Sequence, residues 1–241
     1  MNLIIDVGNS RAKIAVFKED IILKKRMIEN ELLKKAFRDF KTEFPTIEKT
    51  ILSSVSKADF HQKFVSEENI LILDASTPLP FKNLYATPET LGNDRKALVA
   101  AASKWHKWEN TLIIDAGTCL TFDFKNDKNE YLGGAISPGL QMRYRALNAY
   151  TANLPLLSHF EAEGLIGNST KTSMASGVFL GMQKEIEGTI AAYRALYEDL
   201  TIIFTGGDAQ ILSINLKNSI FANSNFLLEG LNYILEFNKS Q

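Results

Sequence analysis

The sequence predicts an α/β protein in which a mixed β-sheet with flanking helices occurs twice. The first observation is an internal repeat, because residues 3–10 (LIIDVGNS) return as residues 112–119 (LIIDAGTC). In each copy a short β-branched run predicts a buried strand that ends at an Asp, and the Gly two residues later permits a sharp turn. The second observation is that each copy leads through three strands into alternating helical and strand patterns, which is typical of a mixed-sheet α/β fold.

The elements of the first half follow from the spacing of apolar residues. A helix is expected where apolar residues recur at helical spacing from Leu32 to Phe40. The other expected elements are a strand at 13–17, a strand after the polar turn at 18–20, strands at 50–53 and 70–73, and a helix at 57–65.

The second half repeats this order. Gly177 and Gly181 interrupt an expected helical stretch over 173–200, where close helix packing would explain them, because each Gly costs a helix about 1 kcal/mol relative to Ala. We expect one domain at 1–110 and a second at 111–241, facing each other across a cleft that is the natural ligand site. The other expected elements are strands near 111–115, 120–124, 131–136, 200–205 and 219–222, and an amphipathic helix from Phe226 to Leu235.

Composition favours a globular protein with a small-molecule ligand. The 241 residues are 45% hydrophobic and 23% charged, and the net charge of -1 gives no general attraction to nucleic acid or anionic lipid. Cys119 is the only cysteine, so no intrachain disulfide is possible, which fits a reducing cytoplasm. Asp6 interrupts the first apolar run, and no run approaches the ~20 residues that span a bilayer. We therefore expect a cytoplasmic protein without nucleic-acid or membrane partners.

The turn after the first strand has the residues of a phosphate-binding hairpin. Gly8 can aim backbone N–H groups at phosphate oxygens, and Asp6 can hold hydrated Mg²⁺. The turn joins two strands, and the P-loop pattern G-x-x-x-x-G-K-[ST] does not occur in the chain. An ordinary Gly hairpin is the alternative, but two copies in register favour phosphate binding. Further donors and positive charges come from Asn9, Ser10, Arg11 and Lys13.

The second copy of this turn carries Asp115, Gly117 and Thr118. Facing the first copy, it would bring another carboxylate and hydroxyl to the same phosphates. The alternative is that Asp115 only caps the end of its strand. The repeat favours the functional interpretation.

Asp94 precedes a predicted helix over 96–108, whose alanines form a buried face. Near a helix N-terminus an Asp is most often an N-cap. The functional alternative makes Asp94 a base that accepts a substrate hydroxyl proton, with Arg95 pairing with an anionic group. The local sequence leaves both interpretations open.

Two further glycine-rich segments follow predicted strands. Residues 133–139 (GGAISPG) join a strand to a helical stretch, and residues 205–208 (TGGD) open a helix. Both could let the backbone approach a ligand, and both could equally be turns. The three histidines, His61, His106 and His159, lack metal-ligand spacing.

Together these motifs resemble the type III pantothenate kinases, members of the superfamily of actin, sugar kinases and heat-shock chaperones. The resemblance covers nearly the whole chain and implies two ribonuclease-H-like domains with a nucleotide cleft between them. It implies ATP-dependent phosphorylation of pantothenate to 4'-phosphopantothenate, the first step toward coenzyme A, in a cytoplasmic homodimer that needs Mg²⁺ and a monovalent cation, K⁺ or NH₄⁺. The motifs that carry it are 6–10 (DVGNS), Tyr85 with 92–95 (GNDR), 115–118 (DAGT), 133–134 with 138–139, and 205–207 (TGG).

The resemblance also implies a role for individual residues. Asp94 would be the catalytic base and contact pantothenate, and Asp115 would bind the monovalent cation. Thr170 would contact pantothenate, with Thr172 as the fallback. The ATP-binding residues would be Asp6, Val7, Gly8, Asn9, Ser10, Arg11, Ala12, Lys13 and Thr118, and the other pantothenate-binding residues Tyr85, Gly92, Asn93 and Arg95.

Two other functions compete with this one. A non-catalytic relative could act as an accessory factor for transcription, and a kinase of the same superfamily could use another acceptor. The intact Asp94 argues against the first, and Tyr85 with residues 92–95 argues against the second. The chain departs from the family at Ser10, where Thr is usual, and at Asn93, where a small residue is common; Ser10 keeps the hydroxyl, so we expect activity.

Overall fold

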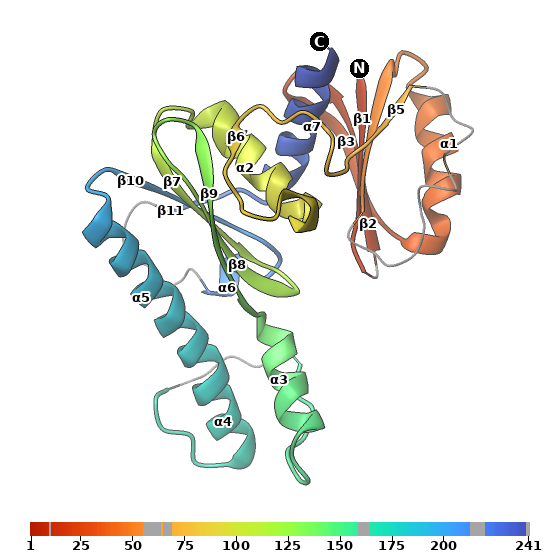
Figure 1. Cartoon of the computed structure of the whole chain (residues 1–241). Coiled ribbons are helices and arrows are strands. Elements are labelled where there is room, and N and C mark those ends of the chain that lie inside the picture. The colour runs from red at the N-terminus through yellow and green to blue at the C-terminus, as the bar shows by residue number, and fades with distance from the viewer. Residues whose placement is uncertain (10, 55–63, 65–68, 159–163, 213–219, 240–241) are drawn as a thin grey trace. The chain divides into compact units, whose positions relative to one another are not determined.

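Figure 1 shows the computed structural model of the chain. It describes residues 1–9, 11–54, 64, 69–158, 164–212 and 220–239. Ser10 and the predicted helix over 57–65, apart from Phe64, lie outside these residues. Among the residues described, no helix is long and apolar enough to cross a membrane. The chain divides into two compact units: unit 1 is Met1–Lys107, Asn129–Leu132 and Asn225–Gln241, and unit 2 is Trp108–Lys128 and Gly133–Ser224.

Unit 1 contains a mixed five-stranded sheet in the order β3-β2-β1-β4-β5. The first three strands are antiparallel neighbours, whereas β4 runs parallel to both β1 and β5. The central strand β1 is buried along its whole length, which explains the apolar run of residues 3–5. The bounds are Asn2–Val7 for β1, Arg11–Lys18 for β2, Ile21–Glu29 for β3, Lys49–Ser54 for β4 and Ile70–Ile72 for β5.

Helices cover both faces of this sheet. Helix α1, Leu33–Glu43, follows the short 3-10 helix η1, Asn30–Leu32, and packs Phe37 and Phe40 against Leu3 and other residues of one face. Helices α2, Asn93–Trp105, and α7, Phe226–Lys239, pack on the other side (Figure 1). The predicted helix over 32–40 is therefore confirmed.

The C-terminal helix α7 belongs to unit 1, although it follows unit 2 in the sequence. Any side chain at Gly230 would collide with the backbone of Ala97 in α2, so the two helices are in close contact. Asn2 of β1 donates a hydrogen bond to Asn232 of α7 across 2.7 Å, in buried surroundings. Unit 2 thus differs from the expected second domain at 111–241, because it lacks this helix and residues 129–132 and begins at Trp108.

The second mixed sheet has the order β11-β10-β7-β8-β9-β6, and all of it except β6, Lys82–Asn83, and the first residues of β9 belongs to unit 2. Strand β7 is antiparallel to β8 and parallel to β10, and β10 is parallel to β11. The hairpin of β7 and β8 repeats that of β1 and β2, which confirms the predicted duplication. The bounds are Asn110–Ala116 for β7, Cys119–Lys125 for β8, Glu130–Pro138 for β9, Leu200–Thr205 for β10 and Ile220–Ala222 for β11.

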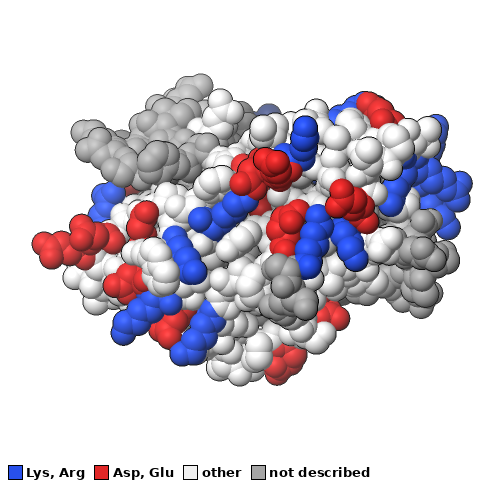
Figure 2. Space-filling model, turned by 90° about the horizontal axis from the view of Figure 1, so that it is seen from above, with Lys and Arg blue, Asp and Glu red and all other residues white. Residues whose placement is uncertain are grey.

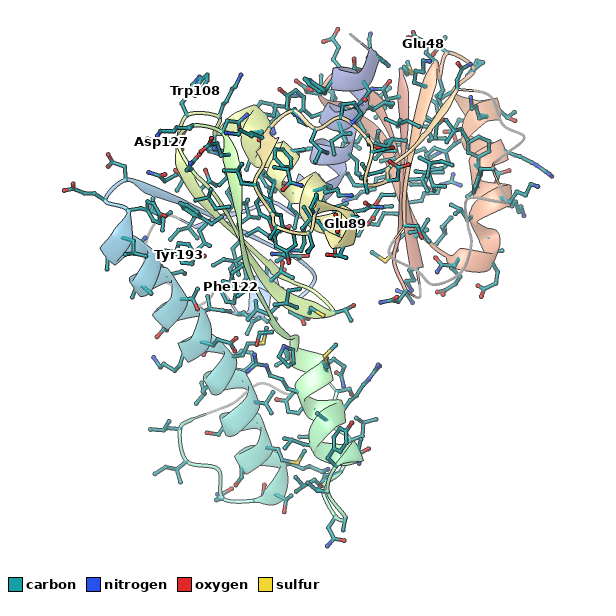
Figure 3. The ribbon with its side chains drawn as sticks, in the orientation of Figure 1. Glu48, Glu89, Trp108, Phe122, Asp127 and Tyr193 are labelled. Atoms are coloured by element: carbon teal, nitrogen blue, oxygen red, sulfur yellow. The ribbon has the colours of Figure 1, made fainter. Side chains whose placement is uncertain are left out.

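Helix α5, Gly181–Leu196, lies along the sheet of unit 2 (Figure 1). The ring of its Tyr193 packs against Phe124 of β8 with centroids 5.2 Å apart, and Phe122, two residues earlier on the strand, joins the same core (Figure 3). This aromatic contact fixes α5 on the sheet. The other helices of unit 2 are α3, Leu140–Ala149; α4, Thr170–Ala175; the π-helical η3, Ser176–Leu180; and α6, Ala209–Leu212.

Two predicted features differ from the structure. The helical stretch expected over 173–200 ends at Leu196, and η3 interrupts its α-helical geometry where the weak helix former Gly177 lies. Strand β9 confirms the strand expected near 131–136 but continues to Pro138, so residues 133–138 form the end of the strand and not a turn. A side chain at Gly134 would collide with the backbone of Phe122 in β8, so the glycine allows close contact between neighbouring strands.

Candidate functional site

The turn between β1 and β2 is closed by a hydrogen bond from the Gly8 N–H to the Arg11 carbonyl, 3.0 Å long. Asn30 supports this turn from outside, because its Nδ2 donates to the Gly8 carbonyl across 3.0 Å and to the Asn9 carbonyl across 3.3 Å. Sequence reasoning missed Asn30. Its contact depends on the pairing of β3 with β2, which places Glu29 opposite Arg11, so no local pattern could have identified it.

Asp6 lies at the end of β1 and is only 9% exposed. Burial raises the pKa of Asp6 to about 6; Lys13 opposes this rise, and the Asp94 carboxylate adds to it. The buried Asp6 carboxylate therefore has one other carboxylate, that of Asp94, and one ammonium group, that of Lys13, in its surroundings. A carboxylate in such a place gains from a cation that replaces its lost hydration.

The other residues predicted to bind ATP fall into two groups. Val7 and Ala12 are fully buried, so that only their backbone is available to a ligand. The side chain of Arg11 is exposed and pairs with Glu29, with Nε 3.0 Å from Oε1. Asn9 is exposed at the tip of the turn.

Asp94 lies in the first turn of α2, where Gly92 is the N-cap and Asn93 the first helical residue. The N-cap interpretation of Asp94 is therefore wrong. Its Oδ1 accepts a hydrogen bond from the Arg95 N–H across 2.8 Å. A side chain at Gly92 would collide with Oδ1, so glycine here leaves room for the Asp94 carboxylate.

Asn93 and Lys96 attach the start of α2 to the end of β5. Asn93 Nδ2 donates to the Leu73 carbonyl across 2.8 Å. Lys96 Nζ donates to the Asp74 carbonyl across 3.0 Å and to Asn93 Oδ1 across 3.1 Å. The side-chain amide of Asn93 thus holds the backbone that carries Asp94.

Arg95 and Tyr85 come together in unit 1. The guanidinium carbon of Arg95 lies 5.6 Å from the centroid of the Tyr85 ring, a cation-π distance. Arg95 is buried, whereas Tyr85 is half-buried. Unit 1 therefore brings Asp94 near Asp6 and Arg95 near Tyr85, four residues that the sequence analysis selected independently of their positions in space.

In unit 2, three predicted glycine motifs meet at one edge of the sheet. Side chains at Gly139 would collide with the backbone of Gly117 and Thr118, and side chains at Gly206 with Ala116 and Asp115. Gly206 has φ 101°, a conformation that favours glycine. The Gly117 N–H bonds to the Cys119 carbonyl across 2.9 Å, which closes the β7–β8 turn. The exposed Thr118 and half-buried Asp115 lie at this edge.

Thr172 belongs to a capping box with Ser169, in which each side chain binds the other residue's backbone N–H. Its hydroxyl is therefore engaged within α4. Thr170 is exposed at the start of the same helix and lines an apolar groove of about 1200 Å³ in unit 2. Other residues that line this groove are Met142, Leu147, Tyr150, Met174 and Gly177.

A polar hollow of about 730 Å³ lies at the end of unit 2 where Trp108 and Asp127 are found (Figure 3). None of the predicted site residues lines it. Figure 2 shows basic and acidic side chains interspersed over the visible face, in agreement with the balanced charge. Among the described residues, no group of three or more His, Cys, Asp or Glu side chains could hold a metal ion.

Residues 2–192 match the family model described as type III pantothenate kinase. The chain belongs to this family. A type III pantothenate kinase of Christiangramia forsetii is 55% identical to this chain over 243 residues, in an alignment that covers 100% of both chains. A type III pantothenate kinase of Flavobacterium johnsoniae is 44% identical, in an alignment that covers 98% of both chains.

Solved structures agree with the fold of this kinase family. A conserved candidate Baf family transcriptional activator from Campylobacter jejuni has a TM-score of 0.65 at 21% identity, covering 99% of this chain and 100% of its own. A candidate 2-dehydro-3-deoxygalactonokinase from Sinorhizobium meliloti has a TM-score of 0.60 at 12% identity, covering 99% of both. At such identities the likeness concerns the fold alone, and it confirms the predicted α/β fold class.

Proposed function

We propose that this protein transfers the γ-phosphoryl group of ATP to the primary hydroxyl of pantothenate, forming 4'-phosphopantothenate in the first step of coenzyme A biosynthesis. The observation that carries this proposal is the 55% identity, over the full length of both chains, to a relative named type III pantothenate kinase. The intact Asp94 and the Asp6 turn support a catalytic rather than an accessory role.

Asp94 would accept the proton of the pantothenate hydroxyl as the oxygen attacks phosphorus. Its place in the first turn of α2, tied down by Asn93 and Lys96, supports this role, because a base must be positioned within reach of the proton that it takes. Phosphoryl transfer depends mainly on positioning and charge neutralisation. A protein nucleophile is therefore not needed.

The β1–β2 turn would bind the phosphates of ATP. Backbone N–H groups of the turn, the side chains of Asn9 and Ser10, and the charge of Lys13 are the expected contacts, and the hydroxyl of Thr118 is a further expected ATP contact. Mg²⁺ bound with ATP would neutralise charge on the phosphates. Mg²⁺ usually keeps several of its waters and binds only one or two protein carboxylates, so the buried carboxylate of Asp6 suits this ion.

Pantothenate would be bound at Tyr85, by residues 92–95 and at Thr170. Arg95 is suited to the substrate carboxylate because its guanidinium can form a bidentate pair. The exposed hydroxyl of Thr170 supports its choice over Thr172, whose hydroxyl serves the capping box. A monovalent cation, K⁺ or NH₄⁺, would lie at Asp115.

We also infer a cytoplasmic homodimer. The apolar groove of unit 2 supports dimerisation, as do exposed Tyr150, Leu165 and Ile166 in the same unit, because large exposed apolar patches commonly mark interfaces. An added Cβ at Gly177 or Gly181 would meet no atom of the described residues within 4 Å, so no contact within that part of the chain explains these glycines. The single cysteine suits a reducing compartment.

The decisive experiment measures ADP release by the purified protein with ATP and Mg²⁺, with and without pantothenate, in K⁺ and then in Na⁺ buffer. Release that requires pantothenate and increases with K⁺ is the expected result, and Asp115→Ala should remove the K⁺ response. No pantothenate dependence in either buffer would refute the substrate. A set of sugar acceptors then tests the other kinase function, and failure of all acceptors would favour an accessory role.

A further inference from the structure

Tyr131 is a fully buried residue at the start of β9, within the part of that strand that belongs to unit 1. Its ring stacks on Tyr85 with centroids 6.0 Å apart and planes inclined by 24°. The guanidinium carbon of Arg95 lies 6.0 Å from the Tyr131 centroid as well as 5.6 Å from that of Tyr85. Tyr131 thus contacts two residues that come from different segments.

The backbone of Tyr131 also holds the segment that carries Tyr85. Strand β6, Lys82–Asn83, pairs in parallel with Glu130 and Tyr131, and the Leu84 N–H donates to the Tyr131 carbonyl across 3.0 Å. The Tyr85 N–H then bonds to the side chain of Asn83. Tyr85 lies just beyond this pairing, so the strand does not fix its side chain. The orientation of its ring therefore depends on the Tyr131 ring on which it stacks.

Arg95 needs aromatic neighbours for a physical reason. It is only 5% exposed, and burial of a charge is costly unless other groups stabilise it. The faces of aromatic rings attract the guanidinium and stack with its plane. Restricting the guanidinium to fewer orientations also fixes its N–H donors, which bidentate recognition of a carboxylate requires.

We propose that Tyr131 is a positioning residue of the pantothenate site: its buried ring sets Tyr85 and Arg95 relative to each other for binding the carboxylate-bearing substrate. This inference rests on the proposed function. The contacts behind it lie at β6, β9 and the start of α2, whereas the proposed ATP contacts lie at the β1–β2 turn. Loss of the Tyr131 ring should therefore raise the KM for pantothenate far more than the KM for ATP.

The test is steady-state kinetics of Tyr131→Leu and Tyr131→Phe with each substrate varied in turn. For Tyr131→Leu we expect the KM for pantothenate to rise about tenfold and the KM for ATP to change by no more than about twofold. Tyr131→Phe keeps the ring, so both of its KM values should stay near those of the wild type. An unchanged KM for pantothenate in folded Tyr131→Leu would overturn the proposal.

Phe81→Leu is the matched control. Phe81 also contacts Tyr131, edge to face with centroids 6.2 Å apart, so its loss disturbs the same core. We expect it to lower the melting temperature while leaving the ratio of the two KM values unchanged. A rise in the pantothenate KM equal to that of Tyr131→Leu would mean that general packing, not positioning, is responsible, and would also overturn the proposal.

Two further measurements keep the test decisive. If Tyr131→Leu does not fold, Tyr131→Met is measured instead, because the flexible Met side chain fills irregular buried space without a ring. If the wild type shows no pantothenate-dependent turnover, the proposed function fails first. Calorimetric titration of the same variants with pantothenate then decides the inference by itself: about tenfold weaker binding only without the ring supports it, and equal or absent binding overturns it.

Discussion

Asn30 donates its side-chain amide to the backbone carbonyl of Gly8, across 3.0 Å and from a different turn of the chain. In a trans peptide the N–H points away from the preceding C=O. A Gly8 carbonyl that points at Asn30 therefore directs the Asn9 N–H to the opposite side of the turn. Asn30 is thus placed to orient a backbone donor of the proposed phosphate site.

Replacing Asn30 by Leu should consequently weaken ATP binding. One neutral hydrogen bond contributes about 0.5–1.5 kcal/mol, so we expect the KM for ATP to rise by about three- to tenfold while the KM for pantothenate stays constant. Asn238→Leu is the control, because Asn238 Nδ2 also donates to two backbone carbonyls, those of Pro78 and Ile234. An unchanged KM for ATP in Asn30→Leu would show that the β1–β2 turn keeps its orientation without the Asn30 hydrogen bond.

Asp94→Asn should lose turnover but keep the fold. The amide is nearly isosteric with the carboxylate and can still accept the Arg95 N–H bond, but it cannot accept the substrate proton. General base catalysis is typically worth about 10²–10⁴-fold, so kcat should fall by that order, with a melting temperature close to the wild type. Asp39→Asn, on the exposed part of α1, should leave kcat unchanged. Near-normal kcat for Asp94→Asn would refute the base.

Asp6 should make stability depend on pH in the absence of ATP and Mg²⁺. Its folded pKa, about 6, lies above its ordinary value of 3.8, so between these values the folded state binds the proton more often than the unfolded state. Stability should then fall as pH rises from about 4 to 6, by up to about 3 kcal/mol.

Urea unfolding of the wild type and Asp6→Asn at several pH values checks this expectation. The variant should be more stable than the wild type at pH 7 and should lack the loss between pH 4 and 6. Equal slopes in the two proteins would mean that Asp6 is not the group responsible. A stabilised but inactive Asp6→Asn would indicate that this carboxylate serves function at a cost in stability.

Lys125 should give the opposite pH dependence in unit 2. Burial lowers its pKa to about 8, although Glu109 and Asp127 oppose the shift. Between this value and its ordinary 10.5 the unfolded state binds more protons, so stability should rise with pH over this range. Lys125→Met should abolish the rise, whereas Lys128→Met, at an exposed site, should keep it. A rise that persists in Lys125→Met would contradict the assignment.

Much of the fold could be read from residue patterns alone. The duplicated strands at 3–7 and 112–116 both begin with the apolar run LII because both occupy central positions in their sheets, and burial on both faces leaves little freedom of composition. The amphipathic pattern of α7 was equally clear. Its place in unit 1 was not, because periodicity says which side of a helix is buried but not against which sheet.

The residues of the candidate site were likewise only partly predictable from the sequence. Local motifs selected Asp6, Tyr85, Asp94 and Arg95, since residue type and turn chemistry are local properties. They could not decide whether Asp94 is a helix cap, because that depends on where the helix begins relative to Gly92. Nor could they find Asn30 or Tyr131, whose roles arise from contacts between segments far apart in the chain.

The sequence by itself determined the family, the duplicated α/β fold and the residue types available for phosphoryl transfer, because these depend on composition and order along the chain. Only the tertiary structure decided that Asp94 shares the surroundings of Asp6, that Arg95 contacts both Tyr85 and Tyr131, and that Asn93 anchors α2 to the end of β5. The physical reason is that pKa shifts, cation-π contacts and hydrogen bonds act over a few ångströms in space. Neighbours at that range are set by packing.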